Sequence, residues 1–216
     1  MRFWLLHEIA SKNFDGYVER DIEGESLRLI DRFIDKSLPD DKRLIISKLV
    51  HSVADLSIIP DIRISDGFVN TFIKALKSEV PIVCDSEMTK AGIYSKNVIS
   101  RSQIYTFLRD IKTIEFAKKT GMTKSAAAIH IAVETLGENC VFVIGNSPTS
   151  LRELVSLWEK HIVNPIAVVG CPVGFVNATL SKYELIKTNL EYVTVLGRRG
   201  GSPMAASVVN AIGMMY

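Results

Sequence analysis

A short cationic turn near the end of the chain carries the residues best suited to binding chemistry. Arg198 and Arg199 are followed by Gly200, Gly201 and Ser202, and a proline then opens an apolar helical pattern. Serine before proline is typical of a helix N-cap and its first turn, and glycines let the backbone approach a ligand closely. Because free N–H groups at a helix start attract anions, these residues are predicted to bind a carboxylate or phosphate. A solvated turn is the alternative.

A histidine is the strongest candidate for proton transfer. His51 ends a helical pattern, and an imidazole can donate a proton because its ordinary pKa lies near physiological pH. Capping or packing at the helix end is the alternative, and the residue types alone leave both open. The remaining histidines are interpreted as structural: His7, His130 and His161. No group of histidines, cysteines and acidic residues has the spacing of metal ligands, so no metal site is predicted.

Two more glycine-containing turns share the character of the first. Gly145 and Asn146 follow one apolar run, and Gly174 and Phe175 lie beyond another. The carboxyl ends of parallel strands meet at one edge of a sheet, where ligands bind, so the turns are expected to converge there and contact a ligand. Phe175 is predicted to stack on that ligand, with a core turn as the alternative. The chain lacks G-x-G-x-x-G and the Walker phosphate loop, which disfavours a dinucleotide.

Two charged residues near these turns are further candidates. Asp85 directly follows an apolar run, and it is predicted either to orient a ligand or to cap the next helix. Lys182 lies shortly before the last apolar run. It is predicted either to contact a second anionic group or to be an ordinary surface lysine.

Alternating apolar runs and amphipathic helices must position these residues. Continuous apolar runs between helices are typical of a parallel sheet covered on both faces. Strands are predicted at 80–84, 98–100, 140–144, 166–169 and 192–196. Helices are predicted at 26–38, from a cap at Asp40 to His51, after a cap at Asp66, and at 151–158. The predicted fold class is α/β, with a parallel, Rossmann-like sheet, helices on both faces and a helical N-terminal region.

Composition narrows the classes of partner. The 216 residues are 47% hydrophobic and 23% charged, which is typical of one globular domain with an ample core. A net charge of +2 disfavours a dedicated nucleic-acid binder. No apolar run is long enough to span a bilayer, and the first residues do not form a signal peptide, so a cytoplasmic protein is expected. Three widely spaced cysteines, Cys84, Cys140 and Cys171, are predicted to be buried free thiols.

An ordered set of motifs carries a family resemblance. Its members are Val50-His51, P-I-V-C-D-S-E-M (81–88), L-R-D (108–110), T-K-S-A-A-A (123–128), G-N-S-P-T (145–149), P-V-G-F-V (172–176) with Ser181-Lys182, and G-R-R-G-G-S (197–202) with Asn210-Ala211. In this order they resemble the precorrin-8X methylmutase family, also called precorrin isomerases or cobalt-precorrin-8 methylmutases. The resemblance runs from about Ile22 to near the C-terminus, and residues 1–21 are interpreted as an extension of a single domain.

The resemblance implies an isomerase of cobalamin biosynthesis. Such an enzyme moves a methyl group from C-11 to C-12 of precorrin-8X or cobalt-precorrin-8, giving hydrogenobyrinate or cobyrinate, without a cofactor. It also implies a homodimer that binds its tetrapyrrole near the subunit interface, with His51 donating a proton to the macrocycle. The acetate and propionate arms of the ring are carboxylates, which suits the cationic turn. A non-catalytic corrinoid carrier is the main alternative, and a nucleotide-using α/β enzyme is disfavoured by the missing phosphate motifs.

Overall fold

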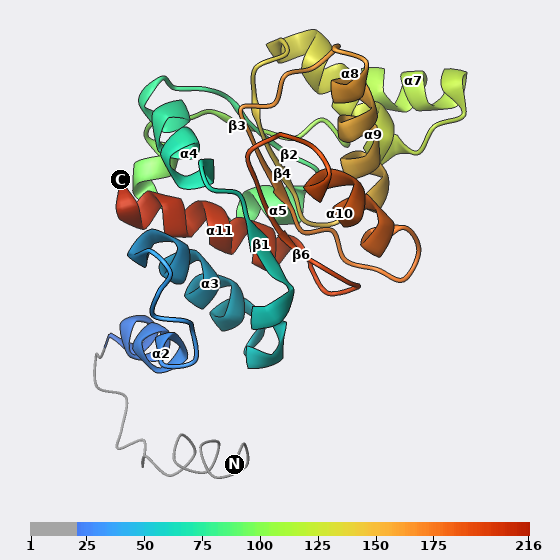
Figure 1. The fold of residues 1–216 in the computed structure, drawn as a ribbon. Coiled ribbons are helices and arrows are strands. Elements are labelled where there is room, and N and C mark those ends of the chain that lie inside the picture. The colour runs from blue at the N-terminus through green and yellow to red at the C-terminus, as the bar shows by residue number, and fades with distance from the viewer. Residues whose placement is uncertain (1–20) are drawn as a thin grey trace.

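The computed structural model describes residues 21–216, in which one sheet forms the centre of the fold (Figure 1). Its six strands lie in the order β1-β6-β5-β4-β2-β3. They are β1 (Ile62–Ile64), β2 (Ile82–Cys84), β3 (Ile104–Tyr105), β4 (Val141–Ile144), β5 (Ala167–Gly170) and β6 (Tyr192–Val195). Every pair is parallel except β1 with β6, which is antiparallel. The predicted parallel sheet is therefore confirmed, with one antiparallel edge strand added.

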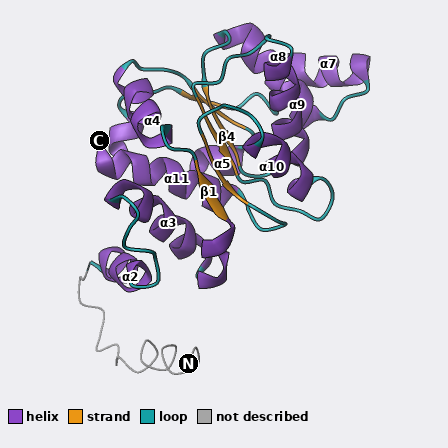
Figure 2. Ribbon diagram, in the orientation of Figure 1, coloured by secondary structure: helices purple, strands orange, loops and turns teal. Residues whose placement is uncertain are grey.

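Helices cover both faces of the sheet, as predicted (Figure 2). One layer holds α2 (Ile22–Asp31), α3 (Asp40–Val53), α4 (Phe68–Lys77), α5 (Glu87–Ala91), α6 (Lys96–Ile99) and α11 (Ser202–Met215), with a short 3-10 helix at Leu56–Asp61. The other holds α7 (Ile111–Thr120), α8 (Lys124–Leu136), α9 (Pro148–Glu159) and α10 (Ala178–Ile186). None of the helices in the described residues is long and apolar enough to cross a membrane.

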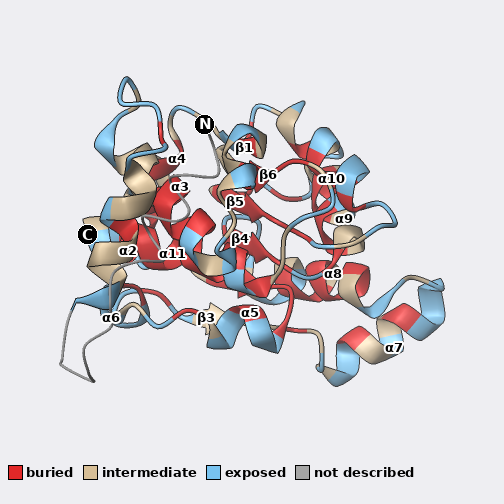
Figure 3. Ribbon diagram, turned by 90° about the horizontal axis from the view of Figure 1, so that it is seen from below, coloured by how far each residue is buried: buried red, intermediate tan, exposed pale blue. Residues whose placement is uncertain are grey.

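The strands are apolar on both sides because each face has its own core. Along β4, Val141 and Val143 pack into the core on the α11 side, whereas Phe142 and Ile144 pack on the α9 side. All four are fully buried, in keeping with the period of two in a strand. Seen from below, the inner strands β2, β4, β5 and β6 and most of α11 form a largely buried centre (Figure 3). This helix is therefore anchored firmly, and its start is a fixed point for a site.

The order of the parallel strands reverses at β2. The strand that follows β2 in the chain, β3, lies on one side of it, and the next strand, β4, lies on the other. This is the flavodoxin-like order, in which ligands usually bind outside the carboxyl ends of the two strands at the reversal. That crevice lies here between Cys84 at the end of β2 and Ile144 at the end of β4.

One strand prediction is wrong, and neither edge strand was predicted. Residues 98–100, predicted as a strand, lie at the end of α6, where the N–H groups of Val98 and Ile99 bond the carbonyl of Ser95. Val98 is buried but Ile99 is 54% exposed, so the apolar pair does not form one buried strand face. The actual edge strand is the two-residue β3. The edge strand β1 was not predicted.

The predicted helices exist, but several boundaries differ. The first, α2, ends at Asp31 rather than at residue 38. Neither Asp40 nor Asp66 is a cap, because the N-cap positions of α3 and α4 fall on Pro39 and Gly67. Their carboxylates make ion pairs instead, and that of Asp66 lies 2.6 Å from the Lys42 ammonium. The predicted extension at 1–21, with His7, lies outside the described residues apart from its last residue.

Candidate active site

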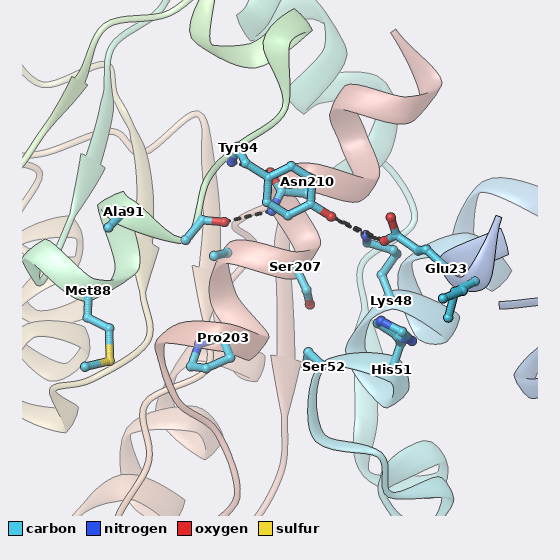
Figure 4. A pocket seen from close by; sticks show the side chains of 13 residues that line it. Glu23, Lys48, His51, Ser52, Met88, Ala91, Tyr94, Pro203, Ser207 and Asn210 are labelled. Atoms are coloured by element: carbon cyan, nitrogen blue, oxygen red, sulfur yellow. Dashed lines mark hydrogen bonds and ion pairs between the residues drawn. The ribbon is translucent and has the colours of Figure 1, made fainter. Parts of the chain in front are cut away.

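A pocket of about 740 Å³ lies between α2, α3, α5 and α11 (Figure 4). Segments far apart in the sequence build it, because α3 and α11 pack side by side on one face of the sheet. Its lining residues are Ile22, Glu23, Lys48, His51, Ser52, Met88, Ala91, Gly92, Tyr94, Pro203, Ala206, Ser207 and Asn210. The pocket thus joins the predicted catalytic histidine to the helix that follows the cationic turn.

His51 lies in the last turn of α3 with its imidazole exposed to this pocket. Its Nδ1 lies 2.8 Å from the Ser26 hydroxyl of α2, which can act as donor or acceptor in that bond. One ring nitrogen is therefore held by the protein, and within residues 21–216 no hydrogen bond occupies Nε2, which can face a ligand. An exposed ring with one oriented nitrogen suits proton transfer, and that role of His51 stays a prediction beside the packing or capping alternative.

An ion pair between buried Lys48 and partly exposed Glu23 forms the wall beside His51. Lys48 is only 3% exposed, its ammonium is paired with the Glu23 carboxylate, and it lies 2.9 Å from the Tyr94 hydroxyl. Burial lowers the pKa of Lys48, but the bonds to Glu23 and Tyr94 outweigh that effect and raise it overall. The bond from Lys48 lowers the pKa of Glu23. Both groups are therefore charged at neutral pH, and they tie α2 to α3 across the pocket.

Asn210 fixes the opposite wall. This residue of α11 is 3% exposed, and its Oδ1 accepts hydrogen bonds from the N–H groups of Tyr94 and Ser95 at 2.9 and 3.0 Å. Its Nδ2 donates to the carbonyl of Gly92 at 2.9 Å. All the polar atoms of one side chain are thus used to hold the 92–95 segment against α11. Tyr94, 60% exposed, is presented to the pocket as a result.

The two arginines of the cationic turn have different surroundings. The Arg199 guanidinium lies 3.0 Å from the Asp55 carboxylate and donates to the Ser57 hydroxyl at 2.7 Å. Arg198 instead lies over the Phe175 ring, with 5.0 Å from its Cζ to the ring centroid. Within the described residues, Arg198 has no acidic partner. Arg198 is thus the arginine whose charge is available to an external carboxylate.

The three glycine-containing turns converge, as predicted. Cys171 donates its N–H to the carbonyl of Ile144 at 2.8 Å, and Gly201 donates to the carbonyl of Cys171 at 2.9 Å. A side chain at Gly200 would have its Cβ 2.3 Å from the Cys171 carbonyl oxygen. Contact between two turns therefore already requires glycine at position 200, and its contact with a ligand stays a prediction.

The prediction that Ser202 caps α11 is wrong. The N-cap position is Gly201, with φ of +124°, and Ser202 is the first helical residue. Its hydroxyl lies 2.8 Å from that of Thr89, and its side chain is buried. Ser147 does cap α9, accepting from the N–H of Ser150. The two Ser-Pro pairs thus differ because the positive φ at Gly201 moves the start of α11 by one residue.

Comparisons with known proteins agree with the motif pattern. The sequence profile of the family described as precorrin-8X methylmutase matches residues 21–215. The chain belongs to the precorrin-8X methylmutase family. It is 36% identical to a cobalt-precorrin-8 methylmutase of Methanocaldococcus jannaschii over 169 residues, covering 78% of this chain and 77% of that protein. It is 34% identical to a precorrin-8X methylmutase of Sinorhizobium sp over 167 residues, covering 76% and 79% of the two chains.

Solved structures of this methylmutase family share the fold. A precorrin-8X methylmutase related protein superposes with a TM-score of 0.83 at 42% identity, covering 88% of this chain and all of the other (100%). A precorrin-8X methylmutase from Thermus thermophilus gives a TM-score of 0.81 at 25% identity, covering 91% and 97%. The mostly parallel sheet flanked by helices is therefore the fold of the methylmutase family.

Asp85, Gly145 and Asn146 do not line the pocket. Asp85 is 3% exposed, and its carboxylate accepts N–H bonds from Gly145, Asn146 and Ser147 at 3.1, 2.7 and 2.7 Å. Burial raises the pKa of Asp85, while these hydrogen bonds lower it. The carboxylate thus fills the crevice at the strand reversal. Capping of the next helix is wrong, since Ser86 caps α5. Ligand contact by these residues stays a prediction.

Gly174, Phe175 and Lys182 surround the cationic turn. Gly174 donates its N–H to the Arg198 carbonyl at 3.1 Å, and Phe175 is 85% exposed, so the core-turn alternative for Phe175 is wrong. Lys182 is fully buried, which excludes a surface lysine. Its ammonium donates to the carbonyls of Gly197 and Arg199. The predicted anion contact of Lys182 has no support in this geometry, because its donors point to the turn.

The remaining candidates are consistent with structural roles. Cys84, Cys140 and Cys171 are free and buried, as predicted. His130 Nε2 lies 2.8 Å from the Glu153 carboxylate, on the face away from the pocket. In the described part of the chain, no three histidine, cysteine or acidic side chains gather as a metal site would require. Ser26, Lys48 and Tyr94 were not predicted, because their partners lie 25 or more residues away along the chain.

Proposed function

We propose that this protein is an isomerase of cobalamin biosynthesis that acts on precorrin-8X or cobalt-precorrin-8. It moves a methyl group from C-11 to C-12 of the ring and gives hydrogenobyrinate or cobyrinate. Membership of the methylmutase family supports this, and the observation that carries it is His51, an exposed imidazole with an oriented nitrogen in the wall of a large pocket. One domain formed by the whole chain is proposed to hold this activity.

His51 is the proposed general acid. With Nδ1 held by Ser26, Nε2 donates a proton to the macrocycle, which makes the conjugated ring electron-poor and lowers the barrier to methyl migration. The methyl group then shifts within the molecule, so no methyl donor and no redox cofactor is consumed. The proton leaves the rearranged ring again, since an isomerisation leaves its composition unchanged.

The cationic turn is the proposed anchor for the ring's carboxylate arms. Arg198 has no acidic partner in the described residues, and its guanidinium can bind a carboxylate through two N–H groups. It lies over Phe175, which is proposed to stack against the macrocycle. Gly174, Gly200, Gly201 and Ser202 shape this turn in the same proposal.

A spectroscopic assay tests the proposed function. The protein is incubated with precorrin-8X, and separately with cobalt-precorrin-8, while visible spectra are followed. Isomerisation extends the conjugation and changes the absorption bands, whereas a corrinoid carrier would leave the substrate's chemistry unchanged. Product identified by its own absorption spectrum and its chromatographic retention supports the isomerase, since substrate and product have the same mass. Bound, unchanged substrate in both incubations would contradict it and favour the carrier.

A cytoplasmic homodimer completes the proposal. Val173, Phe175 and Val176 are exposed apolar side chains beside Arg198, at 44%, 85% and 78%. A second copy covering them would add a wall to the site, which a macrocycle with seven carboxylate arms requires. Buried free thiols fit a reducing compartment. Light scattering is expected to give a dimer at micromolar concentration, and an active monomer would contradict this.

A further inference from the structure

A fully buried lysine lies beneath the cationic turn. Lys182, on α10, is 0% exposed, and its ammonium donates to the carbonyl of Gly197 at 3.1 Å and to that of Arg199. Burying a charge is costly unless its hydrogen-bonding groups are satisfied. A methionine or leucine would fill this position at lower cost. The lysine therefore calls for an explanation beyond packing.

The hydrogen bonds of the turn suggest that explanation. The carbonyls of Gly197 and Arg199 point to Lys182, and the carbonyl between them, that of Arg198, accepts from the Gly174 N–H at 3.1 Å. All three consecutive carbonyl oxygens are thus turned toward protein donors. A carboxylate is repelled by carbonyl oxygens and attracted by N–H groups and cations. The turn consequently presents the Arg198 guanidinium while the carbonyl oxygens of residues 197–199 are occupied by protein donors.

Lys182 keeps enough positive charge for this task. Burial lowers its pKa from 10.5 to about 8, while the nearby Cys171 and Asp61 act in the opposite direction. The ammonium form therefore predominates at neutral pH. An ammonium has three N–H donors, so one side chain can hold two carbonyls that lie on either side of Arg198.

We propose that Lys182 is a positioning residue for substrate binding, because its buried ammonium holds the Gly197–Arg199 turn so that Arg198 faces a substrate carboxylate. Lys182 touches no substrate in this arrangement, and it acts through Arg198. The proposal rests on the proposed function of the site. It predicts an effect on affinity and on KM, and little effect on kcat, since proton transfer belongs to His51 on α3.

A double-substitution experiment tests this role. Lys182→Met removes the ammonium with little change in volume, and Lys187→Met makes the same change at an exposed position just after α10. Affinity for cobyrinate or hydrogenobyrinate is measured by fluorescence quenching or calorimetry, alone and combined with Arg198→Ala. Lys182→Met is expected to weaken binding by about 10- to 100-fold, the range for a hydrogen bond to a charged group. Lys187→Met is expected to bind as the unsubstituted protein does.

The combination with Arg198→Ala decides the mechanism. If Lys182 acts through Arg198, adding Lys182→Met to Arg198→Ala weakens binding by no more than about twofold further, because coupled residues are not additive. Full additivity, or unchanged affinity in folded Lys182→Met, overturns the proposal. Thermal unfolding monitors the fold, and Lys182→Gln, which retains an N–H donor, takes the place of a methionine variant that does not fold.

The same variants separate this proposal from the proposed function. Lys182→Met is expected to raise KM while kcat stays within about twofold, as for loss of binding common to ground and transition states. A fall in kcat with unchanged KM overturns the positioning role. An unsubstituted protein that binds cobyrinate without isomerising precorrin-8X would remove the proposed function, and the binding measurements would still decide the role of Lys182.

Discussion

The β4–α9 and β6–α11 turns are similar in sequence and opposite in electrostatics. Both follow a buried strand, contain glycine and lead through Ser-Pro into a helix. In the first, the buried carboxylate of Asp85 accepts three backbone N–H bonds. In the second, the buried ammonium of Lys182 donates to backbone carbonyls. The N–H groups of the β4–α9 turn are therefore bonded to a buried carboxylate, whereas carbonyl groups of the β6–α11 turn are bonded to a buried ammonium.

This difference supports the proposal that the β6–α11 turn, rather than the β4–α9 turn, binds an external anion. Asp85 already occupies the place that a ligand carboxylate would take at the first turn. At the second turn the internal partner is a cation, so the group left for a ligand is the guanidinium of Arg198. A glycine-rich helix start is therefore a ligand site only where the protein has not supplied its own anion.

The largest effect is expected at His51, which lies in the pocket beside the second turn's helix. His51→Ala should lower turnover by about 10²- to 10⁴-fold, since it removes the proposed general acid. Product affinity should change little, because the proposed carboxylate contacts lie on the cationic turn. Steady-state kinetics and product titration measure the two effects. His130→Ala, which removes a histidine paired with Glu153 elsewhere, is the control. Near-normal turnover of His51→Ala would exclude this residue as the acid.

The next largest effect is expected on stability, when the carboxylate that holds the β4–α9 turn is removed. Asp85→Ala leaves the N–H groups of Gly145, Asn146 and Ser147 without their acceptor, and those of Gly145 and Ser147 are buried. The free energy of unfolding should fall by about 3 kcal/mol or more, since each buried unpaired donor costs 1–3 kcal/mol. Urea unfolding measures this, with Glu87→Ala, an exposed carboxylate on α5, as the control. Equal stability of the two variants would mean that Asp85 does not hold the turn.

Sequence patterns correctly predicted the strands and helices whose apolar residues, spaced for that element, are also buried in the fold. The strands β2, β4, β5 and β6 are apolar on both faces, and the α9 face of Leu151, Leu154 and Val155 is buried as its spacing indicates. The short edge strands were not predictable in this way. β1 contains the exposed Arg63 and pairs with β6 from the other end of the chain, so only tertiary contacts reveal it.

The site was predictable only in its parts. His51 and the cationic turn were found from residue type and motif, but which side chains face them depends on packing between distant segments. Ser26 reaches His51 because α2 packs on α3, and Asp55 pairs with Arg199 across the fold. Lys182 was expected at the surface or on a ligand, because nothing in its neighbours signals complete burial. The sequence thus indicates which residue types could act, but it does not show which side chains contact one another in the fold.

A smaller effect, on product affinity, is expected to distinguish the two arginines of the cationic β6–α11 turn. Arg198→Ala should weaken product binding by about 1.5–3 kcal/mol, the range for a hydrogen bond to a charged group. Arg199→Ala should weaken product binding by less than about 1 kcal/mol, because the Arg199 guanidinium already pairs with Asp55 at an exposed position. Calorimetric titration with cobyrinate compares them. A larger loss for Arg199→Ala would reverse this assignment, and no loss in either variant or in the double variant would make the turn a solvated one.

The smallest effect is a pH dependence of stability that follows from the buried charge of Lys182 beneath the cationic turn. Burial lowers the pKa of Lys182 from 10.5 to about 8, so between these values the unfolded chain binds more protons than the folded one. Stability therefore rises with pH in this window, because the folded state loses the cost of a buried cation. The free energy of unfolding, relative to Lys182→Met, should increase by about 1 kcal/mol from pH 7 to pH 9. Urea unfolding of both proteins at each pH cancels the titration of other groups. A constant difference would show that Lys182 stays protonated throughout, and that the hydrogen bonds to the turn outweigh its burial.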